Sequence, residues 1–327
     1  MRVLFIGGSG IISSACSRLA VERGIDLYTL NRGNEERRPL PAGVTRLRGD
    51  IRAPESARAA LGDLTFDAVV DWVAYTPGHV RADIDLFTGR TGQYVFISSA
   101  SAYQTPPARL PVTESTPLRN PHWRYSRDKI ACEDALVAAY RSAGFPVTIV
   151  RPSHTYDRTA VPFDGGWTAM ARLRRGKEIV VHGDGTSLWV LTHHEDFARG
   201  FVPLLGHPAA IGEAVHITTD EVLTWNQIAE TLAAAAGVPP RIVHVPSAAI
   251  AAADPGWGAG LLGDKAHSMI FDNAKLKRLV PGYVATIPFH RGAREIVAWY
   301  DEDPARQVVD ERLDAVMDKL VADYRPR

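Results

Sequence analysis

The sequence predicts an α/β fold, a doubly wound parallel sheet followed by a smaller, less regular C-terminal lobe. Three observations predict it. Short, continuously apolar runs alternate with segments of helical spacing, a glycine-rich turn follows the first run, and 327 residues suffice to bury a large core. Strands covered by helices on both faces appear as unbroken apolar runs, and such sheets bind ligands at the carboxyl ends of their strands.

Five apolar runs are the predicted strands: Val3–Ile6, Leu27–Leu30, Ala68–Val73, Tyr94–Ile97 and Val147–Val150. Four intervening segments have the spacing or composition of helices: Ser13–Arg23, Pro54–Leu61, Val80–Phe87 and Ser126–Ala143. A strand–helix alternation of this kind builds a parallel sheet, because each crossover helix returns the chain to the same edge.

After Arg151-Pro152 the alternation loosens, and Gly, Pro and Trp become more frequent. A second strand–helix stretch runs from Ala214 to Ala236, and the Gly- and Ala-rich segment Ala252–Gly263 is predicted to be a loop. Near the C-terminus an i, i+3, i+4, i+7 spacing predicts an amphipathic helix that packs in a core or a dimer interface. Its apolar residues are Leu313, Val316, Met317, Leu320, Val321 and Tyr324.

These elements predict two lobes. We expect a dinucleotide-binding domain over residues 1–160, with 190–218 packing back onto it. The segments 161–189 and 219–327 are expected to form a substrate-binding lobe.

Composition argues against several functional classes. Lys+Arg and Asp+Glu are both 37, so the formal net charge is zero and gives no support to nucleic-acid or membrane-surface binding. No window reaches the roughly 18 uncharged apolar residues of a membrane span. Cys16 and Cys132 lack metal-like spacing and are predicted to be free thiols in a reducing compartment. We therefore expect a cytoplasmic protein with no nucleic-acid or membrane partner.

The first candidate site is the turn Gly7-x-x-Gly10-x-x-Ser13, which follows a predicted strand and opens a predicted helix. In a Rossmann dinucleotide site the first glycine permits the tight turn, and the second lets the backbone approach a pyrophosphate at the helix N-terminus. Ser13 stands where the third glycine would pack the helix on the strand. The alternative is a plain tight turn without a ligand.

The choice between NAD and NADP stays open at the end of the second strand. NAD sites usually carry an acidic residue there, whereas this sequence has Asn31 followed by Arg32. Asn31 can hydrogen-bond a ribose hydroxyl, and Arg32, Arg37 and Arg38 could bind the extra phosphate of NADP. A solvated basic loop explains Arg37 and Arg38 equally well.

The second candidate site is Tyr125-Ser-Arg-Asp-Lys129, which places Tyr125 and Lys129 on one face at the start of a helix. An ammonium beside a phenol is expected to lower its pKa, so that the tyrosinate forms near neutral pH. The strand that ends at Ile97 is followed by the hydroxyl-rich stretch Ser98-Ser-Ala-Ser-Ala-Tyr103.

With these motifs in order, the chain resembles the extended short-chain dehydrogenase/reductase family, which includes nucleotide-sugar epimerases and dehydratases. The resemblance covers nearly the whole length. It is carried by the glycine turn, Tyr125-x-x-x-Lys129, and the segments Gly49-Asp-Ile51, Asp67–Ala74, Ser98–Tyr103, Arg151-Pro152, Gly183-Asp-Gly185 and His193–Asp196.

The resemblance implies roles for individual residues. Tyr125 would be the acid/base, Lys129 would hold the ribose and tune Tyr125, and Ser99 would bind the reacting oxygen. The implied cofactor residues are Gly7, Gly10, Ile11, Ile12, Asn31, Arg32, Asp50, Ile51, Val73, Ala74, Tyr125, Lys129, Pro152 and Ser153. The candidate substrate residues are Tyr75, Ser99, Ser101, Tyr103, His154 and Trp189. A homodimer formed through helices beside the Tyr–Lys helix is also implied.

Two departures from the family narrow the expected chemistry. Its dehydratases carry an Asp-Glu pair after the catalytic Ser or Thr, where this chain has Ala100 and Ser101, so dehydration is disfavoured. Its nucleotide-sugar members carry a diphosphate-binding arginine where this chain has Trp189. Because an indole cannot replace a bidentate cation, the substrate is expected to lack a diphosphate. Trp189 either stacks on the substrate or packs in the core, and Arg172, Arg174 and Arg175 are either a phosphate grip or an exposed run.

No metal is expected, because the adjacent residues His193 and His194 would point to opposite faces of a strand. We expect an epimerase that uses NAD, with NADP not excluded, and acts on a sugar, nucleotide sugar or nucleoside by transient oxidation. A net dehydrogenase or ketoreductase is the first alternative. The second is an RNA-binding relative without catalysis.

Overall fold

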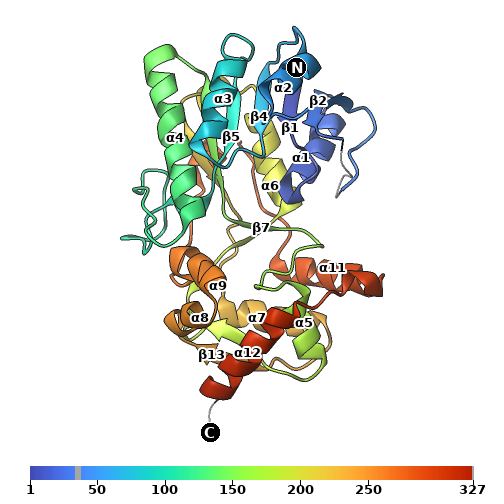
Figure 1. Ribbon diagram of the computed structural model, residues 1–327, viewed down its shortest axis with the longest axis vertical. Helices are drawn as coiled ribbons and strands as arrows, with labels where there is room; N and C mark the ends of the chain where they lie inside the picture. The colour runs from blue at the N-terminus through green and yellow to red at the C-terminus, as the bar shows by residue number, and fades with distance from the viewer. Residues whose placement is uncertain (34–37, 326–327) are drawn as a thin grey trace.

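A seven-stranded parallel sheet forms the centre of the larger lobe in the computed structural model, which describes residues 1–33 and 38–325 (Figure 1). The strand order is β3-β2-β1-β4-β5-β6-β11, and every neighbouring pair is parallel. The strands are β1 (Arg2–Ile6), β2 (Asp26–Asn31), β3 (Thr45–Arg48), β4 (Ala68–Asp71), β5 (Tyr94–Ile97), β6 (Val147–Pro152) and β11 (Ala214–Ile217). This confirms the predicted doubly wound Rossmann fold.

All five strands predicted from apolar runs are present, and β11 begins the predicted strand–helix stretch from Ala214. The remaining strand of the sheet, β3, was not predicted. Its sequence, Thr-Arg-Leu-Arg, is largely exposed because β3 lies at the edge of the sheet. An edge strand needs no continuous apolar run, so that signal is missing here.

Helices cover both faces of this sheet (Figure 1). Val3 and Phe5 of β1 pack against α1 (Ile11–Glu22) and α6 (His194–Phe201), whereas Leu4 and Ile6 face the opposite layer. That layer consists of α2 (Pro54–Leu61), α3 (Pro77–Phe87) and α4 (Arg124–Ala143). Side chains of a strand alternate between the two faces, so one short apolar run serves two cores.

The smaller lobe lies beyond the carboxyl ends of the strands (Figure 1). Its strands form three two-stranded sheets: β7 (His154–Tyr156) with β10 (Leu191–His193), β9 (Leu188–Trp189) with β12 (Leu223–Thr224), and β8 (Ile179–His182) with β13 (Ile242–Val245). Its helices and those that follow β11 are α5 (Trp167–Arg174), α7 (Trp225–Ala235), α8 (Ser247–Ala253), α9 (Pro255–Gly260), α10 (Ala274–Leu279), α11 (Phe289–Asp301) and α12 (Glu311–Tyr324). Single turns are η1 (Ala100–Ala102), η2 (Val202–Leu204), η3 (Pro208–Ala210), the π-helical η4 (Leu261–Lys265) and η5 (Pro304–Arg306).

The prediction that Ala252–Gly263 is a loop is wrong, because this segment contains the end of α8, all of α9 and most of η4. Pro255 begins α9, and the Asp254 side chain caps it by accepting from the amide of Trp257 at 3.0 Å. A Cβ at Gly258 would come within 2.3 Å of Ala251 Cβ, so the glycine permits the close packing of α9 on α8. Here tertiary contacts override the low helix propensity of glycine.

The C-terminal amphipathic helix is confirmed as α12, and its stripe packs in a core. Leu313, Met317, Leu320 and Val321 are buried against residues of β8 and β13. Arg172 on α5 is 1% exposed and pairs with Asp314 and Asp318 of α12. Both interpretations of Arg172 are therefore wrong, since it neither lies on the surface nor is available to a phosphate.

Candidate functional site

The glycine turn after β1 adopts backbone conformations that only glycine takes readily. Gly7 and Gly8 have φ of 99° and 116°. A Cβ on Gly7 would stand 3.4 Å from side-chain atoms of Trp72 and Val73, so the turn lies directly against the end of β4.

Ser13 has a capping role that a glycine could not fill. Gly10 is the N-cap of α1, and its amide donates to Ser13 Oγ at 2.7 Å. The hydroxyl of Ser13 therefore satisfies one of the free donors at the start of the helix. The departure from three glycines changes how the helix is capped and leaves the turn itself intact.

The start of α1 is chemically suited to an anion. The amides of Ile11 and Ile12 find no acceptor within residues 1–33 and 38–325. Unpaired amides and the positive end of the helix dipole attract phosphate oxygens. These two amides, beside Gly10, could hold the pyrophosphate of a dinucleotide.

Arg38 lies beside this turn and is already paired. Its guanidinium donates to Asp157 Oδ2 at 2.6 Å and to Thr159 Oγ1 at 2.5 Å, and it also contacts the carbonyl of Ser9 at 3.5 Å. The Arg38 pair holds the pKa of Asp157 below its usual value. Arg38 is therefore not a solvated loop residue as one interpretation had it, and Arg37 lies outside the described residues.

Asn31 is the last residue of β2 and Arg32 follows it, at the same edge of the sheet as the glycine turn. With its amide oriented to satisfy its neighbours, Asn31 donates to the carbonyls of Leu30 and Gly7 at 3.2 Å, which leaves its oxygen as an acceptor. Arg32 is exposed and has no ion pair with a residue that the structure describes. Asn31 thus helps to hold the turn in place.

Beside the expected adenine site the structure contains a buried ionic network that sequence reasoning missed. Arg52 donates to Asp71 at 2.7 Å and to Asp83 at 3.3 Å, and Tyr94 donates to Asp83 at 2.7 Å. Burial raises the pKa of Asp83 well above its usual value. An aspartate at the end of the apolar run Ala-Val-Val-Asp71 was the available signal, because a buried carboxylate needs a partner.

Asp50 and Ile51 immediately precede this network. Asp50 accepts from the amide of Arg52 at 2.9 Å, and Ile51 is 8% exposed in the core under α2 and α3. Val73 donates its amide to Asp71 at 2.6 Å. The network therefore sets the backbone around these expected cofactor residues.

Tyr125 and Lys129 lie at the start of α4, beside the carboxyl ends of β4 and β5. Lys129 Nζ donates to the carbonyl oxygens of Ala74 and Ile97, both at 2.7 Å. It stands 5.7 Å from the centre of the Tyr125 ring and 4.9 Å from that of the half-exposed Tyr75. The structure thus brings the predicted Tyr–Lys pair to the expected end of the sheet.

The pKa values of this pair correct one prediction. Burial lowers the pKa of Lys129 to about 8. Burial raises the pKa of Tyr125 to about 12, although a hydrogen bond with Ser99 acts to lower it. The expected lowering by Lys129 is therefore not found, because the ammonium is directed to the two carbonyls and not to the phenol.

Three serine hydroxyls form a chain behind Tyr125. Ser126 Oγ donates to Ser101 Oγ at 2.7 Å, and Ser101 and Ser99 Oγ are 2.9 Å apart. Ser101 is 4% exposed and lies on the protein side of Ser99. Ser99 is thus held in place by Ser101, with its hydroxyl turned to Tyr125.

Two of the candidate substrate residues, Tyr103 and Trp189, are buried in the core. Tyr103 is fully buried and bonds His216 at 3.1 Å, so its proposed contact with substrate is wrong. Trp189 is 1% exposed, packs on Trp225 and donates its indole N–H to His154 at 3.0 Å. Its ring therefore belongs to the core, which agrees with the second of the two interpretations.

Pro152 and Ser153 lie between the sheet and the smaller lobe. Pro152 ends β6 and pairs with Ile217 of β11, and Ser153 joins it to β7. Burial lowers the pKa of His154, the next residue, to about 3, so its imidazole is neutral.

The histidine pair stabilises the fold. His193 caps α6 and contacts Glu295 at 3.1 Å, whereas His194 bonds the carbonyl of Ile11 at 3.1 Å. Among the described residues no cluster of His, Cys, Asp or Glu could hold a metal ion.

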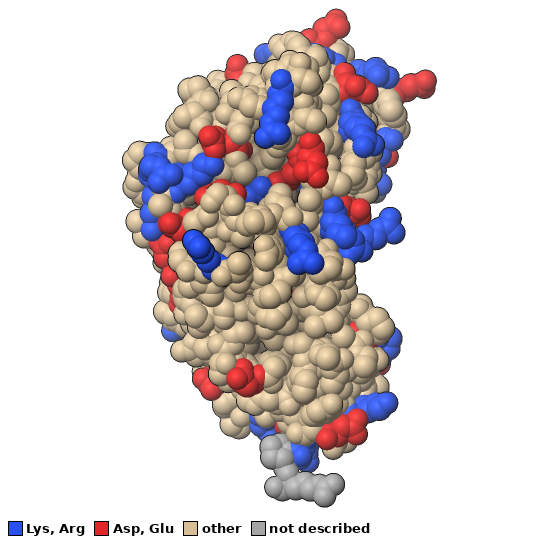
Figure 2. All heavy atoms as spheres, turned by 90° about the vertical axis from the view of Figure 1, so that its left-hand side faces the viewer, with Lys and Arg blue, Asp and Glu red and all other residues tan. Residues whose placement is uncertain are grey.

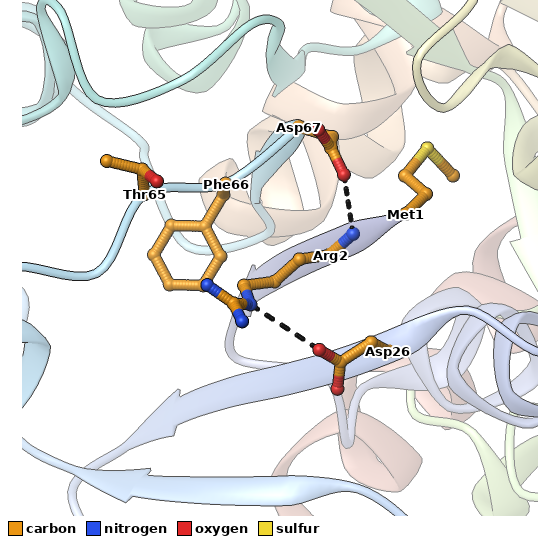
Figure 3. A pocket seen from close by; sticks show the side chains of 6 residues that line it. All are labelled: Met1, Arg2, Asp26, Thr65, Phe66 and Asp67. Carbon is orange, nitrogen blue, oxygen red and sulfur yellow. Dashed lines mark hydrogen bonds and ion pairs between the residues drawn. The ribbon is translucent and has the colours of Figure 1, made fainter.

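A hollow at the other end of the sheet is unrelated to this site (Figure 3). Its lining residues are Met1, Arg2, Asp26, Thr65, Phe66 and Asp67. Arg2 bonds Asp67 through its amide at 2.6 Å and Asp26 through its guanidinium at 3.4 Å. The hollow is at the amino ends of β1, β2 and β4, whereas ligands of parallel sheets bind at the carboxyl ends.

The family resemblance is confirmed by comparison with known proteins. Residues 86–218 match the model of the NAD dependent epimerase/dehydratase family. The chain is 27% identical over 256 residues to a chloroplast stem-loop binding protein of 41 kDa from Arabidopsis thaliana, covering 74% of this chain and 65% of that one. It is 30% identical over 168 residues to a UDP-glucose 4-epimerase from Lactobacillus helveticus, covering 46% and 51%. The alignments thus span less than two thirds of these two relatives.

The fold is shared with solved structures. A UDP-glucose 4-epimerase from Bifidobacterium longum, in complex with NAD+ and UDP, superposes with a TM-score of 0.72 at 18% identity, covering 93% of this chain and 99% of that one. Within the part of the chain that is described, no helix is both long and apolar enough to cross a membrane.

Proposed function

Because residues 86–218 match the model of the NAD dependent epimerase/dehydratase family, we propose that the protein is an NAD-dependent epimerase of a sugar, nucleotide sugar or nucleoside. One observation carries the proposal. Tyr125, Lys129 and Ser99 meet at the carboxyl ends of β4 and β5, on the same edge of the sheet as the turn at Gly7. The reacting groups and the dinucleotide-binding turn thus lie at the same edge of the sheet.

The residues present fit a dinucleotide. The unpaired amides of Ile11 and Ile12 would bind the pyrophosphate, Asn31 the adenosine ribose, and Lys129 the ribose beside Tyr125. The path between the two riboses would be lined by Val73, Ala74, Pro152 and Ser153. The engagement of Arg38 by Asp157 supports NAD over NADP, because that guanidinium is not free for a further phosphate.

The chain's own groups would then perform proton transfer. A nicotinamide dinucleotide held there would supply the hydride acceptor and donor that this chemistry requires. Tyr125 would remove the hydroxyl proton as the carbonyl forms and give it back on reduction, and Ser99 would hold the reacting oxygen. Inversion requires the keto intermediate to turn its other face before the hydride returns.

A net dehydrogenase or ketoreductase is the nearest alternative, since it uses the same three residues and releases the cofactor in each cycle. We also propose a cytoplasmic homodimer, with residues 1–160 and 190–218 as the cofactor domain and the rest as the substrate lobe. The lack of acidic residues at Ala100 and Ser101 argues against dehydration by the usual family route.

The test uses a panel of sugars, UDP-sugars and nucleosides with purified protein. An epimerase inverts one carbon without net change in absorbance of the reduced nicotinamide band. A net oxidoreductase consumes added NAD(P) in proportion to product. If neither is seen with any substrate, or if Tyr125→Phe keeps full activity, the proposed chemistry is wrong.

The stem-loop binding relative and an arginine-rich segment favour RNA binding as a second candidate. Figure 2 shows cationic side chains gathered at the level where the two lobes meet. Exposed arginines of the segment 104–127 are Arg109, Arg119, Arg124 and Arg127. They lie next to the Tyr125 site, so RNA would be expected to cover it.

RNA binding through phosphates has a measurable salt dependence. If the second candidate is right, a labelled stem-loop binds at 50 mM salt, and its affinity falls about 100-fold or more at 200 mM salt. The double variant R109Q/R119Q should lose a large part of this affinity. Arg38 is a poor choice for this test because Asp157 holds it. An RNA affinity that is the same in R109Q/R119Q as in wild type would contradict RNA binding by the segment 104–127.

A further inference from the structure

Two carbonyl oxygens hold the ammonium of Lys129, and they come from different kinds of backbone. Ile97 is the last residue of β5, whereas Ala74 lies in the connecting segment 72–76, between β4 and α3. An ammonium has three N–H donors, so among the described residues these two bonds leave one N–H for a ligand. The direction of that third N–H therefore depends on how the segment 72–76 is held.

Asp71, the last residue of β4, holds this segment. Its carboxylate accepts from the amide of Val73 at 2.6 Å, which fixes the backbone one residue before Ala74. The Val73 side chain lies against the dinucleotide turn, 3.4 Å from where a Cβ on Gly7 would stand. The backbone that Asp71 fixes therefore contacts the turn through one residue and Lys129 through the next.

Arg52 supplies the cation that the buried Asp71 carboxylate needs. Asp71 is fully buried, and the Arg52 guanidinium donates to its second oxygen at 2.7 Å. The bond from the same guanidinium to Asp83 is longer, at 3.3 Å. A buried carboxylate is costly without a cation, and an ionised one is the stronger acceptor for the Val73 amide. Arg52 and Asp71 therefore act on the segment as one unit.

Support of the adenine side is the alternative role of this ion pair, because Arg52 belongs to the loop expected at the adenine. That loop has attachments of its own. The Asp50 carboxylate accepts from the Arg52 amide at 2.9 Å, and the Ser56 hydroxyl accepts from the Asp50 amide at 3.0 Å. The Asp71 carboxylate acts instead on the amide that precedes the contact with Lys129. These bonds favour a role at the Lys129 end.

We propose that Asp71, together with Arg52, is a positioning residue for Lys129. It holds the Ala74 carbonyl so that the third N–H of the ammonium is directed to the dinucleotide ribose beside Tyr125. The inference rests on the proposed function, which places that ribose at Lys129. It predicts that Asp71 affects the binding of this ribose and leaves the binding of the adenosine half unchanged.

The experiment is calorimetry with ADP and ADP-ribose, because these two probes differ by the terminal ribose alone. Wild type is expected to bind ADP-ribose more tightly than ADP. In Asp71→Asn the preference for ADP-ribose should fall about 10-fold, since a hydrogen bond to a charged group is lost, while the affinity for ADP is unchanged. Arg52→Met is the second variant and should show the same pattern.

A double variant tests whether Asp71 acts through Lys129. Lys129→Met should by itself remove the preference for ADP-ribose. The double variant Asp71→Asn/Lys129→Met should then lose no more than Lys129→Met, because residues that act as a unit are not additive. If the two residues acted independently, the two losses would multiply.

Thr148→Val is the control for a general loss of stability. Thr148 is fully buried in β6, and its hydroxyl donates to the Ala210 carbonyl at 2.7 Å and accepts from Gln93 at 2.9 Å. Thr148→Val should lower the thermal midpoint, as Asp71→Asn does, but leave the affinities for both probes at their wild-type values. All titrations are made well below the lowest midpoint.

Equal losses of ADP and ADP-ribose affinity in Asp71→Asn would assign the ion pair to the adenine loop and overturn the inference. So would an unchanged preference in both Asp71→Asn and Arg52→Met, or a wild type without a preference for ADP-ribose. Failure of the proposed function alone gives another pattern. In that case the predicted affinities are found, but no carbon of any sugar, UDP-sugar or nucleoside in the panel is inverted or oxidised.

Discussion

Lys129 and Tyr125 lie one turn apart on α4, yet Lys129 Nζ donates to the carbonyls of Ala74 and Ile97, both at 2.7 Å, and stands 5.7 Å from the centre of the Tyr125 ring. The ammonium therefore ties the chain after β4 to the end of β5. It is also buried without a carboxylate partner among the described residues, and burial lowers its pKa to about 8.

This burial makes stability depend on pH in a defined direction. Between pH 8 and the ordinary lysine value of 10.5, the unfolded chain holds a proton that the folded chain has lost. Stability therefore rises with pH across this window, by at most about 3 kcal/mol from this group. Lys129→Met should lack this contribution. Urea unfolding of both proteins from pH 7 to 10.5 measures this contribution. If the plots of unfolding free energy against pH are parallel for wild type and Lys129→Met, the prediction is wrong.

Tyr125→Phe should lower turnover about 1,000-fold or more, because the phenol carries the proton. Ser99→Ala should cost less, about 10- to 100-fold, since a hydrogen bond to the reacting oxygen is lost. Both variants should bind NAD as wild type does. Steady-state kinetics with calorimetric NAD titration checks this, and a larger loss in Ser99→Ala than in Tyr125→Phe would reverse the assigned roles.

Ser13→Gly restores the third glycine of the dinucleotide turn and removes the cap of α1. We expect a loss of about 1 kcal/mol in the free energy of unfolding. NAD affinity should change less than threefold, because Ser13 Oγ is engaged by Gly10. Ser142→Ala, near the end of α4, is the control for losing a hydroxyl. A large loss of NAD affinity with unchanged stability would mean that Ser13 contacts the cofactor.

Asp157→Asn should shift cofactor preference toward NADP. The ion pair with Asp157 holds Arg38 away from a further phosphate, so weakening it frees the guanidinium. We expect the ratio of NADP to NAD affinity to rise severalfold, up to about 10-fold. Calorimetry with both dinucleotides decides it. The prediction is wrong if wild type already prefers NADP, or if the ratio of NADP to NAD affinity is unchanged in Asp157→Asn.

Sequence patterns predicted the sheet because buried strands must be apolar on both faces. They also brought Tyr125 and Lys129 together, since a spacing of four fixes two side chains on one face of a helix. Tyr103 was assigned wrongly because a hydroxyl-rich turn does not reveal which side chains point inward, and His216 holds this phenol inside.

Residues brought in from distant segments had no local signal. Gly263 stands in a Gly- and Ala-rich stretch, yet it packs against Trp123, beside Tyr125, and its carbonyl accepts from Asn120 at 2.6 Å. Likewise, Arg38 meets Asp157 across 119 positions. Long-range packing of this kind cannot be inferred from periodicity or spacing.

The most direct test of the central claim is to denature the purified protein, with nothing added, and to identify and quantify the released nucleotide by chromatography. An epimerase returns the hydride within one cycle and keeps its cofactor. We therefore expect about one NAD for each chain. A protein that is empty and binds NAD(P) only when it is added would contradict epimerisation and favour a net oxidoreductase. One that binds no dinucleotide at all would overturn the cofactor site itself.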